Sequence, residues 1–232
     1  MINYGYRKKC PNFDVEIEKE EYSQGQNSIA ELIGRSVDLK RHFSFLELAC
    51  KKNHHYMIIA GKGVGKTIFL QYLLSLALDR WKKSENDYLR KIKFYPINVE
   101  ALLGHQSAVT LKLKELSDKF ESNPNIIPVI DGAELLLDTD SPIHNQFVSV
   151  FGSVLMASFR TWVIVVEPQT VHRSVYLKGI KGYPLPALGE IDTHFLLKKR
   201  LKKISEIDAE SITIEEQLIE SLTQLIIKLA VE

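Results

Sequence analysis

Cysteine is scarce in this sequence, which has only two thiols, Cys10 and Cys50, far apart along the chain. There is no Cys-x-x-Cys pair and no regular ladder of cysteines. A fold held by disulfides is therefore excluded, and the thiols are those expected in a reducing compartment. The adjacent pair His54-His55 has no Cys or third His at ligand spacing, so we expect solvent-facing side chains there and no metal site.

Long apolar runs and an excess of either charge are also missing. No stretch approaches the length of a membrane span, and the N-terminus lacks the apolar core of a signal peptide. Lys and Arg number 30 against 29 Asp and Glu, so bulk electrostatics indicate neither a nucleic-acid partner nor a membrane surface. No internal repeat or low-complexity segment is present. We expect a cytoplasmic protein with no nucleic-acid partner and no membrane insertion.

What the sequence does contain is an apolar strand, Tyr56–Ala60, that runs into a glycine-rich turn and a helix, Gly65–Trp81. Such a turn brings backbone N–H groups to a phosphate at the positive end of a helix dipole. Ala60 stands where the G-x-x-x-x-G-K-[S/T] pattern has glycine. The residues expected to bind nucleotide here are Gly61, Lys62, Gly63, Val64, Gly65, Lys66 and Thr67. Lys66 would reach the β- and γ-phosphates and Thr67 would hold Mg²⁺. The alternative is a glycine-rich turn without a ligand.

A second apolar run, Ile126–Asp131, ends in a carboxylate. A buried parallel strand presents such a residue at the carboxyl edge of its sheet, where ligands of α/β folds bind. Together with the phosphate loop, Asp131 is therefore expected to be the second Mg²⁺ ligand. The predicted ligand is ATP or ADP with Mg²⁺.

Strands and helices alternate along the rest of the chain, which favours an α/β fold with a parallel sheet. We predict an extended N-terminal arm over residues 1–30, a nucleotide-binding core over 31–189 and a helical lid over 190–232. The lid helix from Asp192 is expected to bury an apolar stripe that includes Phe195 and to expose its lysines. The other predicted helices cover 29–53, a stripe from 111 to 120, 143–159 and 214–230; the other predicted strands cover 93–99, 161–166 and 183–188.

Residues 32–41, Leu-Ile-Gly-Arg-Ser-Val-Asp-Leu-Lys-Arg, resemble the Ile-Gly-Arg-x-x-Glu-Ile-x-Arg opening of the first ATPase domain in Clp-type AAA+ unfoldases and disaggregases. The family's Gly-Val-Gly-Lys-Thr recurs unchanged at Gly63–Thr67. The resemblance covers about residues 30–205. It implies an α/β P-loop NTPase fold of AAA+ type, with a parallel five-stranded sheet flanked by helices and a shortened helical lid. Adenine would pack near Ile33 and Gly34.

The chain departs from this family where the family carries out hydrolysis. The family's strand-end Asp is followed by the Glu that activates water, whereas here Gly132 follows. Glu134 lies two residues further on, where we expect a strand-to-loop turn to keep it out of line. The family's paired arginines fall at Lys181 and Gly182. Loss of a general base lowers turnover about 10²- to 10⁴-fold, and loss of an arginine finger about 10³- to 10⁵-fold.

Two further parts of the family's machinery differ. Residues 104–109 lack the aromatic pore-loop residue that grips substrate. The polar sensor after the fourth strand is replaced by Glu167-Pro168, with Gln169 or Thr170 as stand-ins. The resemblance thus implies a degenerate domain that binds nucleotide, hydrolyses it weakly or not at all, and serves as a structural or adaptor subunit among other proteins of a bacterial assembly.

A working Clp-like ATPase for protein remodelling or transport, completed by Glu134 or by a partner's residue, is the alternative function. The third possible function is that of an interaction surface only, with a pocket that stays empty. Without arginine fingers and with a shortened lid, we do not expect a homohexamer.

Overall fold

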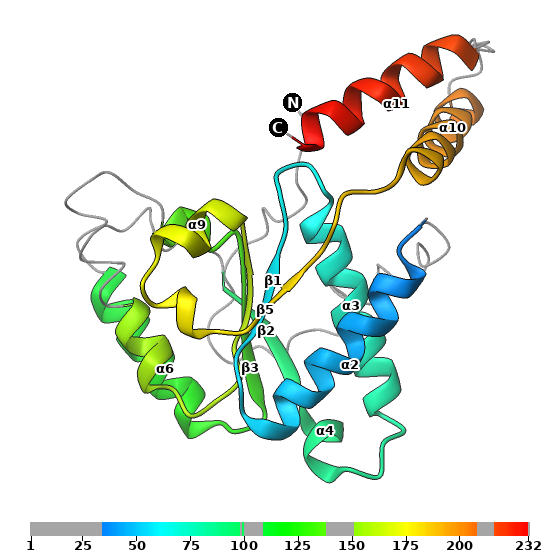
Figure 1. Ribbon diagram of the computed structural model, residues 1–232. Helices are drawn as coiled ribbons and strands as arrows, with labels where there is room; N and C mark the ends of the chain where they lie inside the picture. Colours follow the sequence, from blue (N-terminus) through cyan, green and yellow to red (C-terminus); the bar gives the residue numbers. More distant parts are fainter. Residues whose placement is uncertain (1–33, 98, 100–108, 138–150, 208–215, 232) are drawn as a thin grey trace.

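A parallel β-sheet forms the centre of the molecule (Figure 1). The computed structural model describes residues 34–97, 99, 109–137, 151–207 and 216–231. Five strands are hydrogen-bonded in the order β2-β3-β4-β1-β5, and every neighbouring pair is parallel. They are β1 (Tyr56–Ile59), β2 (Lys93–Pro96), β3 (Ile126–Asp131), β4 (Val163–Val166) and β5 (Gly182–Pro184). The predicted fold class, an α/β P-loop NTPase fold with a parallel five-stranded sheet, is confirmed.

Helices cover both faces of this sheet, which is why its three inner strands β1, β3 and β4 are largely continuous apolar runs rather than alternating ones. Along β1, Tyr56 and Ile58 belong to one apolar cluster and Met57 to the other. The cluster on the first face is covered by α2 (Ser36–Lys52), α3 (Lys66–Trp81) and α4 (Asp87–Lys91). The other face is covered by α6 (Val109–Ser122), the helical residues 151–157 and the short η2 (Leu177–Gly179). Parallel strands held between two helical layers bring their carboxyl ends together at one edge.

The predicted elements are present, but several begin or end elsewhere. The strand predicted over 93–99 ends at Pro96, although the N–H of Ile97 still donates to the Val129 carbonyl at 2.8 Å. The strand predicted over 183–188 ends at Pro184, although the N–H of Leu185 still donates to the Ile59 carbonyl at 2.8 Å. The strand predicted over 161–166 begins at Val163, and the helix predicted over 29–53 begins at Ser36. Residues 29–33 and 143–150 lie outside the described part.

Three short α-helices were not predicted. In α4 the side chain of Asn86 accepts from the N–H of Leu89 at 3.1 Å, a local cap that starts a helix within a polar stretch. α9 (Pro168–Arg173) follows β4 directly and has Pro168 in its first turn, where proline is tolerated. α7 (Glu134–Leu137) follows β3. Both α7 and α9 begin at the edge where the strands end.

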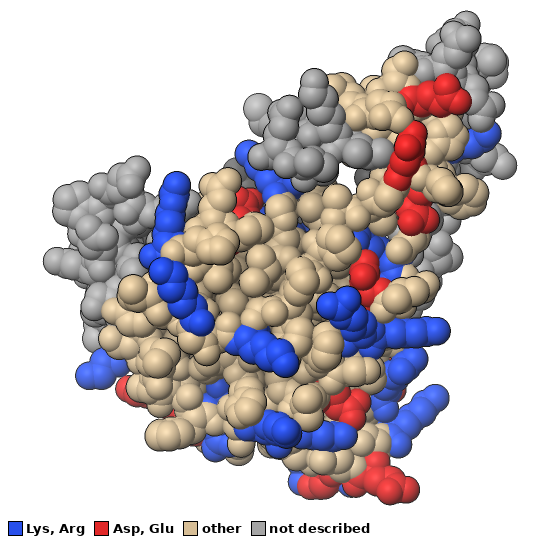
Figure 2. Space-filling model, viewed as in Figure 1, with Lys and Arg blue, Asp and Glu red and all other residues tan. Residues whose placement is uncertain are grey.

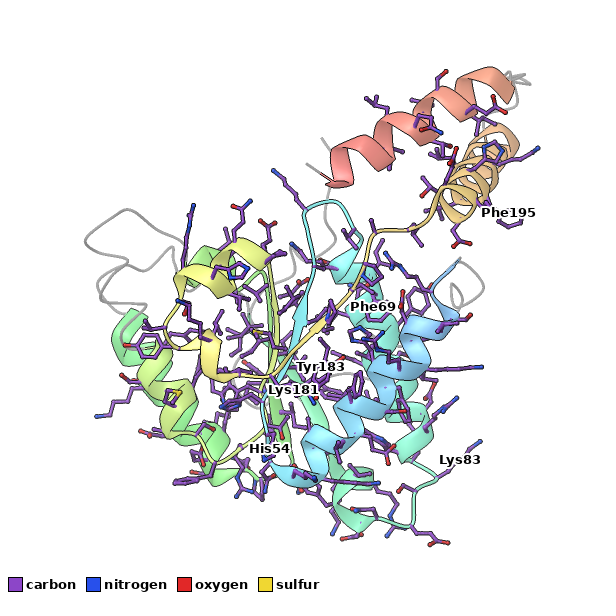
Figure 3. All side chains as sticks on the ribbon, in the orientation of Figure 1. His54, Phe69, Lys83, Lys181, Tyr183 and Phe195 are labelled. Carbon is purple, nitrogen blue, oxygen red and sulfur yellow. The ribbon has the colours of Figure 1, made fainter. Side chains whose placement is uncertain are left out.

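The last two helices, α10 (Glu190–Ile207) and α11 (Glu216–Val231), pack against each other and project beyond the sheet and its covering helices (Figure 1). The prediction that Phe195 is buried is wrong. Its side chain is 59% exposed, and Figure 3 shows it pointing outward from α10. Thr193 of the same helix is buried instead. A residue two positions further along an α-helix is rotated by about 200° around the helix axis. Burial of Thr193 therefore turns Phe195 to the opposite side. Residues 1–30, the predicted arm, are outside the described part.

Charged side chains of both signs lie on the surface of the molecule. On the face shown in Figure 2, Lys and Arg side chains are scattered and do not gather into one patch. In the described part of the chain, no helix is both long enough and apolar enough to cross a membrane.

Candidate nucleotide site

The glycine-rich turn between β1 and α3 has the backbone that a phosphate loop requires. Gly63 and Gly65 have φ of 78° and 85°, in the left-handed region that residues with a Cβ rarely adopt. A Cβ added at either would meet nothing within 4 Å, so glycine is needed there for conformation and not for space. Ala60 is not left-handed, and its N–H donates to Val166 at 3.1 Å within the sheet. The alanine is therefore compatible with the loop. Lys62 is exposed on the turn.

Lys66, the first residue of α3, turns its side chain toward the strand ends. Its ammonium donates to the Glu167 carboxylate at 3.0 Å and to the Ala60 carbonyl at 3.4 Å, and forms an ion pair with Glu134 at 3.5 Å. The side chain is only 13% exposed. An ammonium with three donors thus has three protein partners, two of them carboxylates.

Asp131, at the end of β3, lies beside the first turn of α3. Its carboxylate accepts a hydrogen bond from the Thr67 hydroxyl. Burial raises the pKa of this carboxyl above its usual range, while that hydrogen bond and the charge of Lys66 partly oppose the shift. A partly buried carboxylate of this kind is stabilised by a nearby cation. The hydroxyl of Thr67 and the carboxylate of Asp131 are hard oxygen ligands and fit a Mg²⁺ that keeps its remaining positions for water and phosphate. No group of three or more potential metal ligands occurs within the described residues.

Glu134 lies nearer to the site than expected. We predicted that it would stay out of line, whereas its Oε1 is 3.5 Å from the Lys66 ammonium. Gly132 explains the difference: at a φ of 80° it turns the chain sharply after β3, and α7 begins two residues later with Glu134 in its first turn. The N–H of Ala133 donates to Val165 at 2.9 Å and fixes this turn to β4. The second carboxylate oxygen of Glu134 is buried without a hydrogen-bond partner among the described residues.

Glu167, the first residue after β4, takes the place predicted for a polar sensor. The proposed stand-ins do not: Gln169 is exposed, and Thr170 is buried without a hydrogen-bond partner for its hydroxyl in the described part. The signal was available, because β4 lies next to β1 in the sheet and the first residue after it must end near the phosphate loop.

Around the base-binding end, Ile33 lies outside the described residues. Gly34 has a φ of 71°, and a Cβ built on it would clash with the Asp192 side chain of α10. Arg35 is buried and was not predicted from the sequence. Its guanidinium donates to the carbonyls of Val64 at 3.2 Å and Pro186 at 2.6 Å, and so ties the phosphate loop to the segment that leads into α10.

The positions that correspond to the paired arginines offer no side chain of that kind. Lys181 lies over the ring of Tyr183, with its ammonium 5.5 Å from the ring centre (Figure 3). A Cβ on Gly182 would clash with the Ile59 side chain, so β5 has no room for a larger residue there unless Ile59 moves. Residues 104–108 of the pore-loop position lie outside the described part.

The adjacent histidines lie at the end of β1 away from the phosphate loop, and the described residues bring no third potential metal ligand to them. His54 is exposed, as predicted, and Figure 3 shows it at the start of β1. The prediction for His55 is wrong: it is partly buried, and its Nε2 lies 2.8 Å from the Leu155 carbonyl. That contact comes from a helix far along the chain, which local sequence does not reveal.

The comparisons with known proteins agree on the fold. A family model described as ORC-CDC6-like matches residues 37–122, which is less than half of the chain. Among solved structures, this chain resembles the Hsp104–ADP complex of S. cerevisiae at 14% identity and a TM-score of 0.63, covering 88% of this chain and 35% of that one. The chain thus spans about a third of that protein.

A second similar solved structure is the HORMA:CdnC:Trip13 complex of E. coli MS115-1. It matches at 14% identity and a TM-score of 0.51, covering 87% of this chain and 76% of that one. The search of curated proteins gave no significant match. Together with the sheet order and the glycine-rich loop, these likenesses show the P-loop NTPase fold.

Proposed function

We propose that this chain binds ATP or ADP with Mg²⁺ and serves as a structural or adaptor subunit of a bacterial multiprotein assembly, with slow or no hydrolysis. The observation that carries the proposal is the convergence of Lys66, Thr67 and Asp131 at one edge of the sheet, beside a loop with left-handed glycines. The loop N–H groups and Lys66 would hold the phosphates, while Thr67 and Asp131 would hold Mg²⁺. That ion neutralises phosphate charge when bound.

The similar solved structures support the same proposal. One of them is a complex with ADP, and the other contains several different proteins. Lys181 and Gly182 supply no arginine for a neighbouring subunit's phosphate, which favours a subunit bound to different proteins over a closed homohexamer.

Nucleotide binding is tested by thermal unfolding with and without Mg-ADP and Mg-ATP. We expect either ligand to raise the melting temperature, because a ligand at about 100 times its Kd stabilises the folded state by about 2.7 kcal/mol. Lys66→Ala should abolish the rise. Lys83→Ala removes an exposed lysine beyond the end of α3 and should keep it. If millimolar nucleotide does not change the melting temperature of the wild type, the alternative of an empty pocket is favoured.

An active ATPase is the second candidate, and the 3.5 Å contact between Glu134 and Lys66 favours it. A carboxylate this close to the phosphate-binding ammonium is within reach of a water beside the terminal phosphate. Glu134→Gln separates the two functions. An active enzyme would lose about 10²-fold or more of its turnover, whereas the structural subunit has little turnover to lose. Wild-type turnover above about one per second, lost in Glu134→Gln, would replace our proposal with this one.

A further inference from the structure

The ammonium of Lys66 is the group that would bind the β- and γ-phosphates. In this chain it already forms an ion pair with the carboxylate of Glu167. The Glu167 Oε1 lies 3.0 Å from it, the distance of a charge-assisted hydrogen bond. A phosphate oxygen that binds the same ammonium must displace that carboxylate or lie beside it.

The backbone of Glu167 is held in place, so the residue cannot move away from Lys66 as a unit. Its carbonyl accepts from the N–H groups of Thr170 at 3.2 Å and Val171 at 3.4 Å, so its backbone is fixed at the start of α9. Pro168 follows and restricts the backbone further. Only the side chain can move, and it is 29% exposed. Its carboxylate therefore stays close to the phosphate-binding end of Lys66.

Nearby charges add to this effect. Glu134 lies on the same ammonium, and its buried second oxygen has no partner in the described region. The two carboxylates outnumber the single charge of Lys66. A nucleoside triphosphate adds one negative charge more than a diphosphate, and it adds that charge at the end of the chain of phosphates that Lys66 reaches.

We propose that Glu167 determines phosphate number at this site, so that the chain prefers a nucleoside diphosphate to a triphosphate. The inference rests on the proposed nucleotide binding and deepens it. Like charges a few ångströms apart at a partly exposed site repel by enough to change affinity about tenfold. The β-phosphate, which the loop N–H groups also hold, is expected to feel this repulsion less than the γ-phosphate.

Isothermal titration calorimetry with ADP and with a non-hydrolysable β,γ-imido analogue of ATP, both in millimolar Mg²⁺, tests the preference. Wild type should bind ADP about tenfold more tightly than the analogue. Glu167→Gln, which keeps the size and removes the charge, should bring the two affinities within about twofold, mainly by strengthening the analogue. Glu85→Gln removes an exposed carboxylate in the loop after α3 and should leave the wild-type ratio unchanged.

The outcomes separate this inference from the proposed function. Binding of neither ligand by wild type overturns both. Equal wild-type affinities, or a Glu167→Gln change that is the same for the two ligands, overturn the role of Glu167 and leave nucleotide binding intact. Glu167→Ala is the second variant if Glu167→Gln does not fold, with the same expected loss of preference.

Discussion

The phosphate loop and the strand ends that face it meet at the same ammonium group, yet different forces fix their shapes. The loop is fixed by its own backbone, since Gly63 and Gly65 are left-handed with open space around them. The facing edge is fixed by distant contacts: Asp131, Glu134 and Glu167 come from β3, α7 and the end of β4, and the sheet brings them together.

This difference separates two kinds of functional information. A loop that depends on backbone conformation is visible as a short motif, because glycine spacing and a flanking helix suffice to build it. A cluster of acidic side chains depends on sheet order and on where each short helix begins. The loop keeps the sequence pattern of nucleotide-binding proteins, whereas the acidic residues of the facing edge follow no such pattern. The role of the loop in phosphate binding is therefore better supported than the role of the acidic residues that face it.

Gly65→Ala tests the backbone half and has the largest expected effect on stability. At a φ of 85°, a residue with a Cβ costs about 1–2 kcal/mol, which should lower the melting temperature by roughly 2–8 °C for a chain of this size. Gly179→Ala is the matched control, because Gly179 is not left-handed and its added Cβ would meet nothing within 4 Å. Thermal unfolding without nucleotide measures both. Equal shifts in the two variants would contradict the conformational role of Gly65.

Asp131→Asn tests the acidic half, where we expect a gain in stability and a loss of binding. Burial raises the pKa of Asp131 in the folded chain above its value in the unfolded chain. Between these two pKa values, the folded chain binds the proton more tightly than the unfolded chain does. The contribution of Asp131 to stability therefore falls as pH rises through that range, and the ionised carboxylate destabilises the fold at neutral pH. The variant should melt about 1–3 °C higher without ligand.

The same variant should lose the Mg²⁺-dependent part of nucleotide stabilisation, which thermal unfolding with and without Mg²⁺ measures. Wild type and variant should differ most at neutral pH, and the difference should shrink as pH falls, because Asp131 then becomes protonated. A variant that is less stable than wild type at neutral pH would show that the hydrogen bond from Thr67 outweighs the burial of charge.

The elements of the fold were predictable because periodicity and motif spacing are local. The phosphate loop and Asp131 could be located from an apolar run ending in a characteristic residue, and the five strands from their apolar or alternating patterns. Strand ends were less predictable, as Pro96 and Pro184 show, since ladder bonds such as Ile97 to Val129 depend on the neighbouring strand.

The side chains around Lys66 were harder to predict. The approach of Glu134 depends on the left-handed φ of Gly132 and on the hydrogen bond between Ala133 and Val165, neither of which a sequence pattern expresses. The same is true of Arg35, whose two carbonyl partners lie 29 and 151 residues away. Such contacts follow from topology and appear only once the sheet is assembled.

Two histidines outside the nucleotide site, His42 and His55, should make the stability of the fold depend on pH. Burial lowers the pKa of His42, whose ring nitrogens lie 2.6 Å from the Tyr56 hydroxyl and 3.2 Å from the Pro184 carbonyl. Burial likewise lowers the pKa of His55. A folded pKa below the unfolded value of 6.5 means that the unfolded chain takes up the proton first. Stability should be complete above about pH 6.5 and fall as pH drops below it, by at most about 1.4 kcal/mol per pH unit for each imidazole.

His55→Gln separates this effect from the carboxylates at the nucleotide edge. A glutamine amide can still donate to the Leu155 carbonyl but cannot titrate, so the loss of stability between pH 7 and pH 5 should shrink to the part that His42 contributes. His54→Gln is the matched control, since His54 is exposed and its removal should leave the wild-type slope unchanged. Urea unfolding at a series of pH values measures all three proteins. If His55→Gln keeps the full acid-induced loss, burial of His55 is not its cause, and the titrating groups must be sought elsewhere in the core.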